Sequence, residues 1–286
     1  MSEGLLSFAA DIIAEGRAAL ATPGLWDAAA VHDFRKAMKR WRAFLRLIEP
    51  SVGEPAARLR IEARDIARAL GAARDAQSAL DALADLRQHD AALPARAAAA
   101  LAGRLEALRR EAEAAALTDD IRERMRLSLE AAAAALREWP LGDLHVSDLA
   151  AGLAEGYRRA RAATPRKWLQ ADPEELHRLR TRVVVHRYQM DALAPLWPRF
   201  AKFWVGEAQR LREHLGGCQD LAVLAALAGP DRPLAAWGAR LAPLVAERQA
   251  AHVAAAARIA ARLFAEKPGA FRRRILAVWE NARALA

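Results

Sequence analysis

Long stretches of the chain place apolar residues at helical spacing. The segment at residues 27–49 shows this most clearly, because its large apolar side chains are three or four residues apart and share one face of a helix. These side chains are Phe34, Met38, Trp41, Leu45 and Ile48. No strand-like alternation appears, valine and isoleucine are sparse, and the abundant alanine, leucine and arginine favour helix. The chain is therefore predicted to be all-α.

Proline and glycine clusters divide this pattern into segments. Breaks are expected at residues 22–24, 50–55, 94, 118–120, 139–142, 164–165, 195–198, 229–230, 243 and 267–269. They predict about five or six long helices on each side of a boundary near residues 140–148. The sequence Asp172-Pro173-Glu174-Glu175 is typical of a helix start, because Asp172 can cap the first turn and Pro173 suits the first helical position.

The same motifs occur twice, 145 residues apart. His32-x-x-Arg35 recurs as His177-x-x-Arg180, and Leu70-Gly71 recurs as Leu215-Gly216. The offset also relates Asp27 to Asp172, Arg42 to Arg187, and Asp75 to Asp220. An ungapped register of this length predicts two copies of one helical unit. We therefore expect a single domain over residues 1–286, with one helical half at residues 1–140 and the other at residues 145–286.

One face of the helix predicted at residues 27–49 is almost wholly cationic. Its cations lie within roughly 80° of His32, opposite the apolar face. They are Arg35, Lys36, Lys39, Arg42 and Arg46. Like charges four residues apart repel by a few tenths of a kcal/mol, so a face that retains them is expected to meet an anion. Arg60, Arg64 and Arg68 form a second basic stripe on the next helix. The alternative interpretation is an ordinary solvated surface.

The second copy keeps fewer of these charges. His177, Arg180 and Arg187 hold their places, whereas the positions of Lys39 and Arg46 are taken by Val184 and Asp191. We expect Arg158 and Arg161, in the preceding segment, to restore part of the charge. The second copy is therefore expected to bind an anion more weakly than the first.

Composition narrows the classes of function. The net charge is +9, and arginine supplies most of the positive charge, so an anionic partner is favoured. Cys218 is the single cysteine, which excludes an intrachain disulfide and fits a reducing compartment. There is no charge-free apolar stretch long enough to span a membrane, and the N-terminal segment lacks the basic start of a signal peptide. A cytoplasmic protein without a membrane segment is expected.

The repeated motifs resemble those of the CHAD family, which is named for conserved histidines in an α-helical domain. The resemblance extends from about Leu5 to Trp279. It implies two antiparallel helical bundles related by a pseudo-twofold axis, with a basic cleft between them. It also implies binding of inorganic polyphosphate, and some members are associated with polyphosphate granules. The binding candidates carried over by position are His32, Arg35, Lys36, Lys39, Arg42, Arg46, His177, Arg180 and Arg187, to which we add Arg60, Arg64, Arg158 and Arg161.

No motif of an enzyme or metal site accompanies these cations. The Glu-x-Glu-x-Lys motif of triphosphate tunnel domains, a glycine-rich phosphate loop and His-Glu-x-x-His are all absent from the sequence. We therefore expect a non-catalytic protein without a cofactor or metal. The alternative partner is nucleic acid, but single-strand binders usually add aromatic stacking platforms. Phe34 and Trp41 lie on the apolar side of the basic helix, and Tyr188 is the one aromatic residue that projects with His177.

Overall fold

The structure is a computed structural model that describes residues 2–21, 28–69, 71–89, 93–116, 118–195 and 197–284. All regular structure in these ranges is helical, as the sequence predicts, and none of it is strand. The long helices are α1 Ser2–Leu20, α2 Ala28–Val52, α3 Glu54–Ala69, α4 Gly71–His89, α5 Ala95–Ala116, α6 Asp119–Glu138, α7 Val146–Ala162, α8 Pro173–Asp191, α9 Pro198–Leu227, α10 Gly238–Leu263 and α11 Pro268–Ala284. Three short 3₁₀ helices are η1 Leu141–Asp143, η2 Trp168–Gln170 and η3 Ala235–Trp237.

Local sequence signals set several helix ends. The carboxylate of Asp172 accepts a hydrogen bond of 2.7 Å from the backbone N–H of Glu175, which confirms the predicted cap of α8. Asp27, the expected cap of the first copy, lies outside the described residues. Gly53 separates α2 from α3 in a left-handed conformation, with φ of 79°, that glycine adopts without strain. The break expected at Pro243 is wrong, because α10 begins at Gly238 and continues through this proline.

The apolar face of α2 forms the centre of the main core. Phe34, Met38, Trp41, Leu45 and Ile48 are each at most 1% exposed, which confirms the predicted core face. This core is continuous with the buried side chains of α1, α3, α6, α7, α8, α9 and α11. Burial of such large apolar side chains contributes about 1.5–3 kcal/mol each, so α2 is fixed in position along its length.

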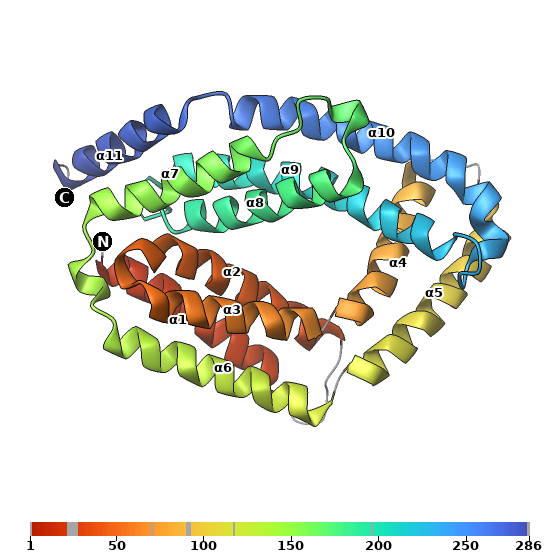
Figure 1. Ribbon diagram of the computed structural model, residues 1–286, viewed down its shortest axis with the longest axis horizontal. Helices are drawn as coiled ribbons and strands as arrows, with labels where there is room; N and C mark the ends of the chain where they lie inside the picture. Colours follow the sequence, from red (N-terminus) through yellow and green to blue (C-terminus); the bar gives the residue numbers. More distant parts are fainter. Residues whose placement is uncertain are drawn as a thin grey trace.

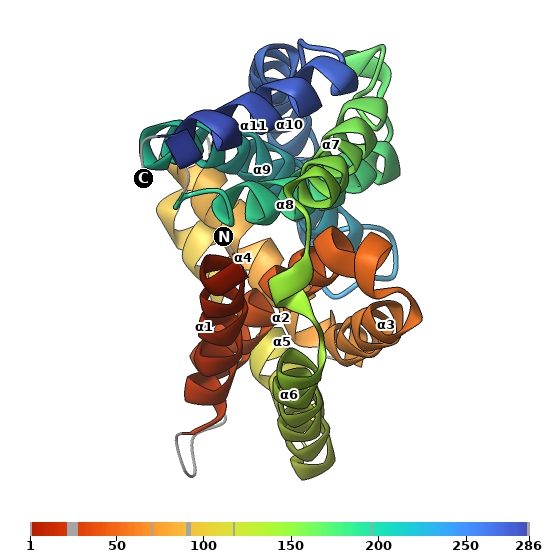
Figure 2. The ribbon, with the colours of Figure 1, turned by 90° about the vertical axis from the view of Figure 1, so that its left-hand side faces the viewer.

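The helices pack in two groups that meet along α2. Helices α1, α2, α3 and α6 lie together, and α7 to α11 lie above them in the view of Figure 1. Figure 2, the side view, shows α7, α8, α10 and α11 above α1, α3 and α6. Helix α2 contacts both α7 and α8. A Cβ at Gly152 of α7 would lie 2.7 Å from the backbone oxygen of Leu47, so the missing side chain permits this close approach.

Helices α4 and α5 form a separate pair that packs on α9 and α10 (Figure 1). The contact has its own small core, which includes Leu83, Leu86, Leu224 and Leu241. The carboxylate of Asp85 on α4 accepts two hydrogen bonds of 2.7 Å from the guanidinium of Arg248 on α10. It also lies 2.9 Å from Nε2 of His252 on the same helix. These polar contacts join segments more than 160 residues apart in sequence.

Within the described residues, no helix combines the length and apolar character that crossing a membrane requires.

Candidate anion-binding site

A pocket with basic walls lies where α2, α3, α8 and α9 meet. Its volume is about 340 Å³. We call it the basic pocket and define it by the residues that line it. These are Arg35, Lys39, Arg42 and Arg46 of α2; Arg64, Ala67 and Arg68 of α3; His177, Arg180, Thr181, Val184, Val185, Arg187 and Tyr188 of α8; and Arg212 of α9. The described lining thus contains eight arginines and one lysine but no carboxylate.

Two arginines of α2 are held in this pocket with their charge poorly solvated. Burial lowers the pKa of Arg42, and the positive charges of Arg60 and Arg64 lower it further. Burial also lowers the pKa of Arg46 to about 10, with additional repulsion from Arg42 and from Arg182 of α8. Both guanidinium groups remain protonated at neutral pH, so the pocket keeps its positive charge at a cost in free energy.

The geometry leaves some guanidinium N–H groups without a protein acceptor. The Nε atoms of Arg42 and Arg187 are buried and have no hydrogen-bond partner among the described residues. The guanidinium of Arg187 also lies over the ring of Tyr188, 4.1 Å from its centroid. Because burying a polar N–H without an acceptor is unfavourable, these groups are ready to donate to an anion that enters the pocket.

Other contacts position the remaining arginines at the pocket wall. Arg35 donates from an Nη atom to the backbone oxygen of Ala67, 3.0 Å away, which ties α2 to α3. A Cβ at Gly216 of α9 would lie 3.6 Å from Nε of Arg180, so the Leu-Gly motif of the second copy packs directly beside this guanidinium. Arg64 is paired with its neighbour Asp65 at 2.9 Å, and both side chains are well exposed.

The structure brings together most of the predicted site residues but not all of them. Arg35, Lys39, Arg42, Arg46, Arg64, His177, Arg180 and Arg187 line the basic pocket. His32 and Lys36 are exposed on α2 and do not line it. The carboxylate of Glu49 accepts a hydrogen bond of 2.8 Å from Arg60, which therefore stands in an ion pair outside this pocket.

The two candidates on α7 also lie outside the basic pocket. Arg158 donates a 2.6 Å hydrogen bond to Glu155 on its own helix, and both side chains are largely accessible to solvent. Arg161 donates from Nε to the backbone oxygen of Phe264 at 2.9 Å, which links α7 to the end of α10. In their place the pocket includes Arg68, part of the basic stripe already visible in the sequence, and Arg212. No periodic basic pattern on α9 marks Arg212 in advance.

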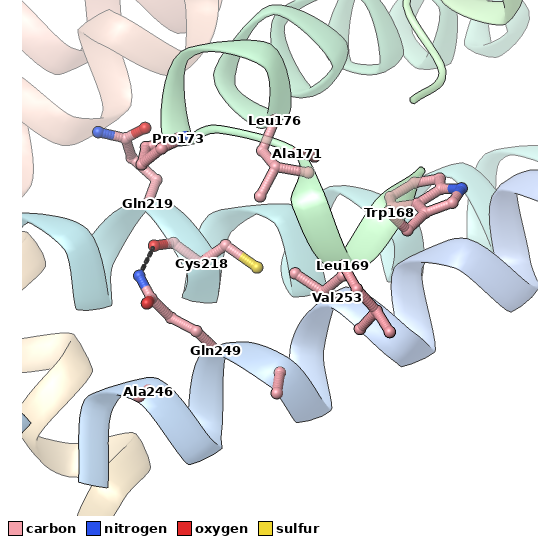
Figure 3. Close-up of a pocket in the computed structure, with 11 residues that line it drawn as sticks. Trp168, Leu169, Ala171, Pro173, Leu176, Cys218, Gln219, Ala246, Gln249 and Val253 are labelled. Atoms are coloured by element: carbon pink, nitrogen blue, oxygen red, sulfur yellow. Dashed lines mark hydrogen bonds between the residues drawn. The ribbon is translucent and has the colours of Figure 1, made fainter. Parts of the chain in front are cut away.

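An apolar pocket on the other side of α8 differs sharply from the basic pocket. It lies between the start of α8, η2, α9 and α10, and Figure 3 shows Trp168, Leu176 and Val253 around it with Cys218 at its wall. Its described lining contains no charged residue. Burial raises the pKa of the Cys218 thiol to about 12, so this group stays protonated at neutral pH. Within the described ranges, no three His, Cys, Asp or Glu side chains are arranged to hold a metal ion.

Comparison with known proteins agrees with this architecture. The sequence profile of the CHAD domain matches residues 10–229. Among solved structures, the chain is similar to the crystal structure of the CHAD domain from the plant Ricinus communis, with 19% sequence identity and a TM-score of 0.59. The match covers 97% of this chain and 92% of that chain, and at this identity it concerns the fold alone. A search of curated proteins gave no match.

Proposed function

We propose that this chain, which belongs to the CHAD domain family, binds inorganic polyphosphate in the basic pocket without transforming it. The residues to which we assign this role come from all four helices that line the pocket. They are Arg35, Lys39, Arg42, Arg46, Arg64, His177, Arg180 and Arg187 from the sequence prediction, joined by Arg68 and Arg212. Association with polyphosphate granules in the cytoplasm is part of the same proposal.

The observation that carries the proposal is that Arg42, Arg46 and Arg187 carry their positive charge in the pocket without an ion pair. No carboxylate of the described residues lies within ion-pair distance of any of the three guanidinium groups, although each is at least half-buried. A protein gains nothing in stability from such a cluster, because desolvation and mutual repulsion both oppose it. A bound polyanion would replace the missing counterions and accept the free N–H groups.

Polyphosphate suits such a site chemically. It carries about one negative charge per phosphate and presents only phosphoryl oxygens, which guanidinium groups bind through paired hydrogen bonds. It has no bases. A site for it therefore needs many cations on rigid helices, and it needs no side chains that form hydrogen bonds with base edges. The basic pocket has this composition.

Nucleic acid is the weaker candidate because the basic pocket offers no platform for base stacking. Tyr188 is the one aromatic residue in its described lining, and this residue is only 7% exposed. The guanidinium of Arg187 covers its ring. Single-stranded nucleic acids gain about 1–3 kcal/mol per base from stacking on exposed aromatic rings, and this contribution is missing here.

A competition experiment separates the two ligands. Fluorescent single-stranded DNA is bound to the protein, and polyphosphate is added at matched total charge. We expect polyphosphate to displace the DNA at a much lower charge concentration than DNA displaces bound polyphosphate. Equal exchange in both directions would show a general anion surface and contradict the proposal. Release of inorganic phosphate in the presence of magnesium or manganese would contradict the non-catalytic part of it.

A further inference from the structure

A second pocket adjoins the basic pocket at Arg46. It lies between α2, α3, α7 and α8, and its volume is about 650 Å³, compared with 340 Å³ for the basic pocket. Arg46 of α2 and Val185 of α8 line both pockets. We call it the mixed pocket, because its described lining includes both signs of charge. The charged residues are Arg46, Arg60, Arg159, Arg182, Glu49, Glu54 and Glu155.

Ion pairs within the protein already neutralise part of the positive charge in the mixed pocket. Glu49 accepts a hydrogen bond of 2.8 Å from Arg60, across the gap between α2 and α3. Glu155 accepts one of 2.5 Å from Arg159 and is also paired with Arg158. These arginines pull the pKa of Glu155 down to about 2, so its carboxylate is charged at neutral pH. Two of the four arginines thus have an internal counterion.

The other two arginines of the mixed pocket form no ion pair, although the charge of Glu49 acts on Arg46 from a greater distance. No carboxylate of the described residues lies within ion-pair distance of Arg46 or Arg182. Arg182 is close enough to lower the pKa of Arg46, and Arg42 does so from the side of the basic pocket. Arg42 lines the basic pocket, Arg182 lines the mixed pocket and Arg46 lines both, so positive charge extends from one pocket into the next.

We propose that the mixed pocket is an extension subsite that holds the continuing segment of a long polyphosphate chain and thereby favours long chains over short ones. This inference rests on the proposed function of the basic pocket. A short polyphosphate finds most of its uncompensated cations in the basic pocket and stays there. A long chain continues past Arg46, gains Arg182, and competes with Glu49 and Glu155 for their arginines. Arg182 therefore adds affinity for long chains alone, whereas Glu49 and Glu155 reduce the affinity of the mixed pocket for the chain.

The test compares one short and one long ligand on the same variants. Tripolyphosphate and long-chain polyphosphate are titrated by calorimetry into the wild-type protein and into Arg182→Ala. We expect the variant to bind the long chain about threefold to tenfold more weakly, as for the loss of one charge-assisted contact at a partly solvated site. Its affinity for tripolyphosphate should be unchanged. The control is Arg212→Ala, because Arg212 lines the basic pocket but not the mixed pocket, and its loss should weaken binding of both ligands.

A second variant acts in the opposite direction, so loss of folding cannot imitate its effect. Glu155→Gln removes a negative charge from the mixed pocket and should strengthen binding of the long chain alone. Its matched control is Glu123→Gln on α6, which removes one of the two exposed glutamate partners of Arg126 and should change neither affinity. Equal effects of Arg182→Ala on both ligands, or no gain from Glu155→Gln, would overturn the extension subsite. Absence of binding by the wild-type protein would instead refute the proposed function itself.

Discussion

At the scale of single residues, the proposed function depends on half-buried arginines that form no ion pair with the described residues. Arg42 and Arg46 sit on the same helical face, and burial lowers the pKa of both. The opposite face of this helix is fully occupied by core side chains. The arginines therefore stay on the face that lines the basic pocket, where a bound anion would relieve their repulsion.

Charge reversal at two of these positions tests the location of the site. We expect Lys39→Glu combined with Arg42→Glu to weaken polyphosphate binding by about a hundredfold or more, because attraction becomes repulsion at two contacts. Helicity and the melting temperature should stay nearly unchanged, since neither side chain belongs to the core. The matched control reverses Arg104 and Arg110, which are exposed on α5 and do not line the pocket. If the double variant folds and its affinity for polyphosphate is unaltered, the binding site lies elsewhere on the protein.

A buried histidine predicts how stability depends on pH. His186 is fully buried, and burial lowers its pKa from 6.5 to about 3. Its Nε2 accepts a hydrogen bond of 3.1 Å from the indole N–H of Trp204, which requires this nitrogen to be unprotonated. Below pH 6.5 the unfolded chain binds a proton at this residue and the native protein does not. The free energy of unfolding should therefore fall by about 2 kcal/mol between pH 6.5 and pH 5.

Chemical denaturation at a series of pH values measures this effect. His186→Gln keeps an acceptor for Trp204 but cannot titrate, so the loss of stability on acidification should be smaller in the variant. A smaller loss should persist, because burial and the nearby His252 also lower the pKa of His214. Equal pH dependence of the variant and the wild type would contradict the assignment to His186.

Residue types and helical spacing are enough to predict the cations that α2 contributes to the basic pocket, whose role in binding stays a proposal. Arg35, Lys39, Arg42 and Arg46 were identified from one helical projection, and the structure brings all four to one pocket. The same projection also selected His32 and Lys36, which do not line it, because a projection shows direction but not how far along the axis a neighbouring helix reaches. Arg212 could not be identified, since its place in the pocket depends on how α9 packs against the other helices.

At the scale of helices, the sequence predicts helix ends better than it predicts how distant helices pack together. The cap at Asp172 and the breaks near Gly53 and Thr118 follow from backbone chemistry within a few residues, and the structure has them as expected. The position of the α4–α5 pair on α9 and α10 depends on contacts across more than 100 residues, so no local pattern predicts it. The expected break at Pro243 is wrong because one missing backbone donor does not break a well-packed helix such as α10.

The attachment of α4–α5 gives a prediction at this scale. Although burial raises the pKa of Asp85, hydrogen bonds from Arg248 and His252 outweigh it and lower that pKa to about 2. We expect Asp85→Asn to reduce the free energy of unfolding by about 1–3 kcal/mol, because Arg248 then loses its carboxylate partner at a largely buried site. Amide hydrogen exchange should accelerate first in α4 and α5. Denaturant titration and exchange mass spectrometry provide the measurements.

The control for this prediction lies on the same helix. Asp81 is exposed and, among the described residues, accepts a side-chain hydrogen bond from Gln77 alone, so Asp81→Asn should change stability little. If both variants were equally stable, the Asp85 contacts would not secure the pair, and its small apolar core would have to do so alone.

At the scale of the whole molecule, the net charge of +9 is unevenly distributed over the described residues. Many arginines elsewhere are paired with glutamates on their own helices, such as Arg126 with Glu123 and Arg210 with Glu207. The described lining of the basic pocket lacks carboxylates, so positive charge is concentrated there. The relation of residues 1–140 and 145–286 by a pseudo-twofold axis, and their equal or unequal share in binding, stay predictions.

Polyphosphate binding is tested most directly by calorimetric titration of the wild-type protein with long-chain polyphosphate, at low salt and again at about physiological salt. Single-stranded DNA of matched total charge is titrated alongside. We predict tight polyphosphate binding that weakens steeply with salt, because bound counterions are released, and that exceeds DNA binding at both salt concentrations. DNA binding that equals or exceeds polyphosphate binding would contradict the account.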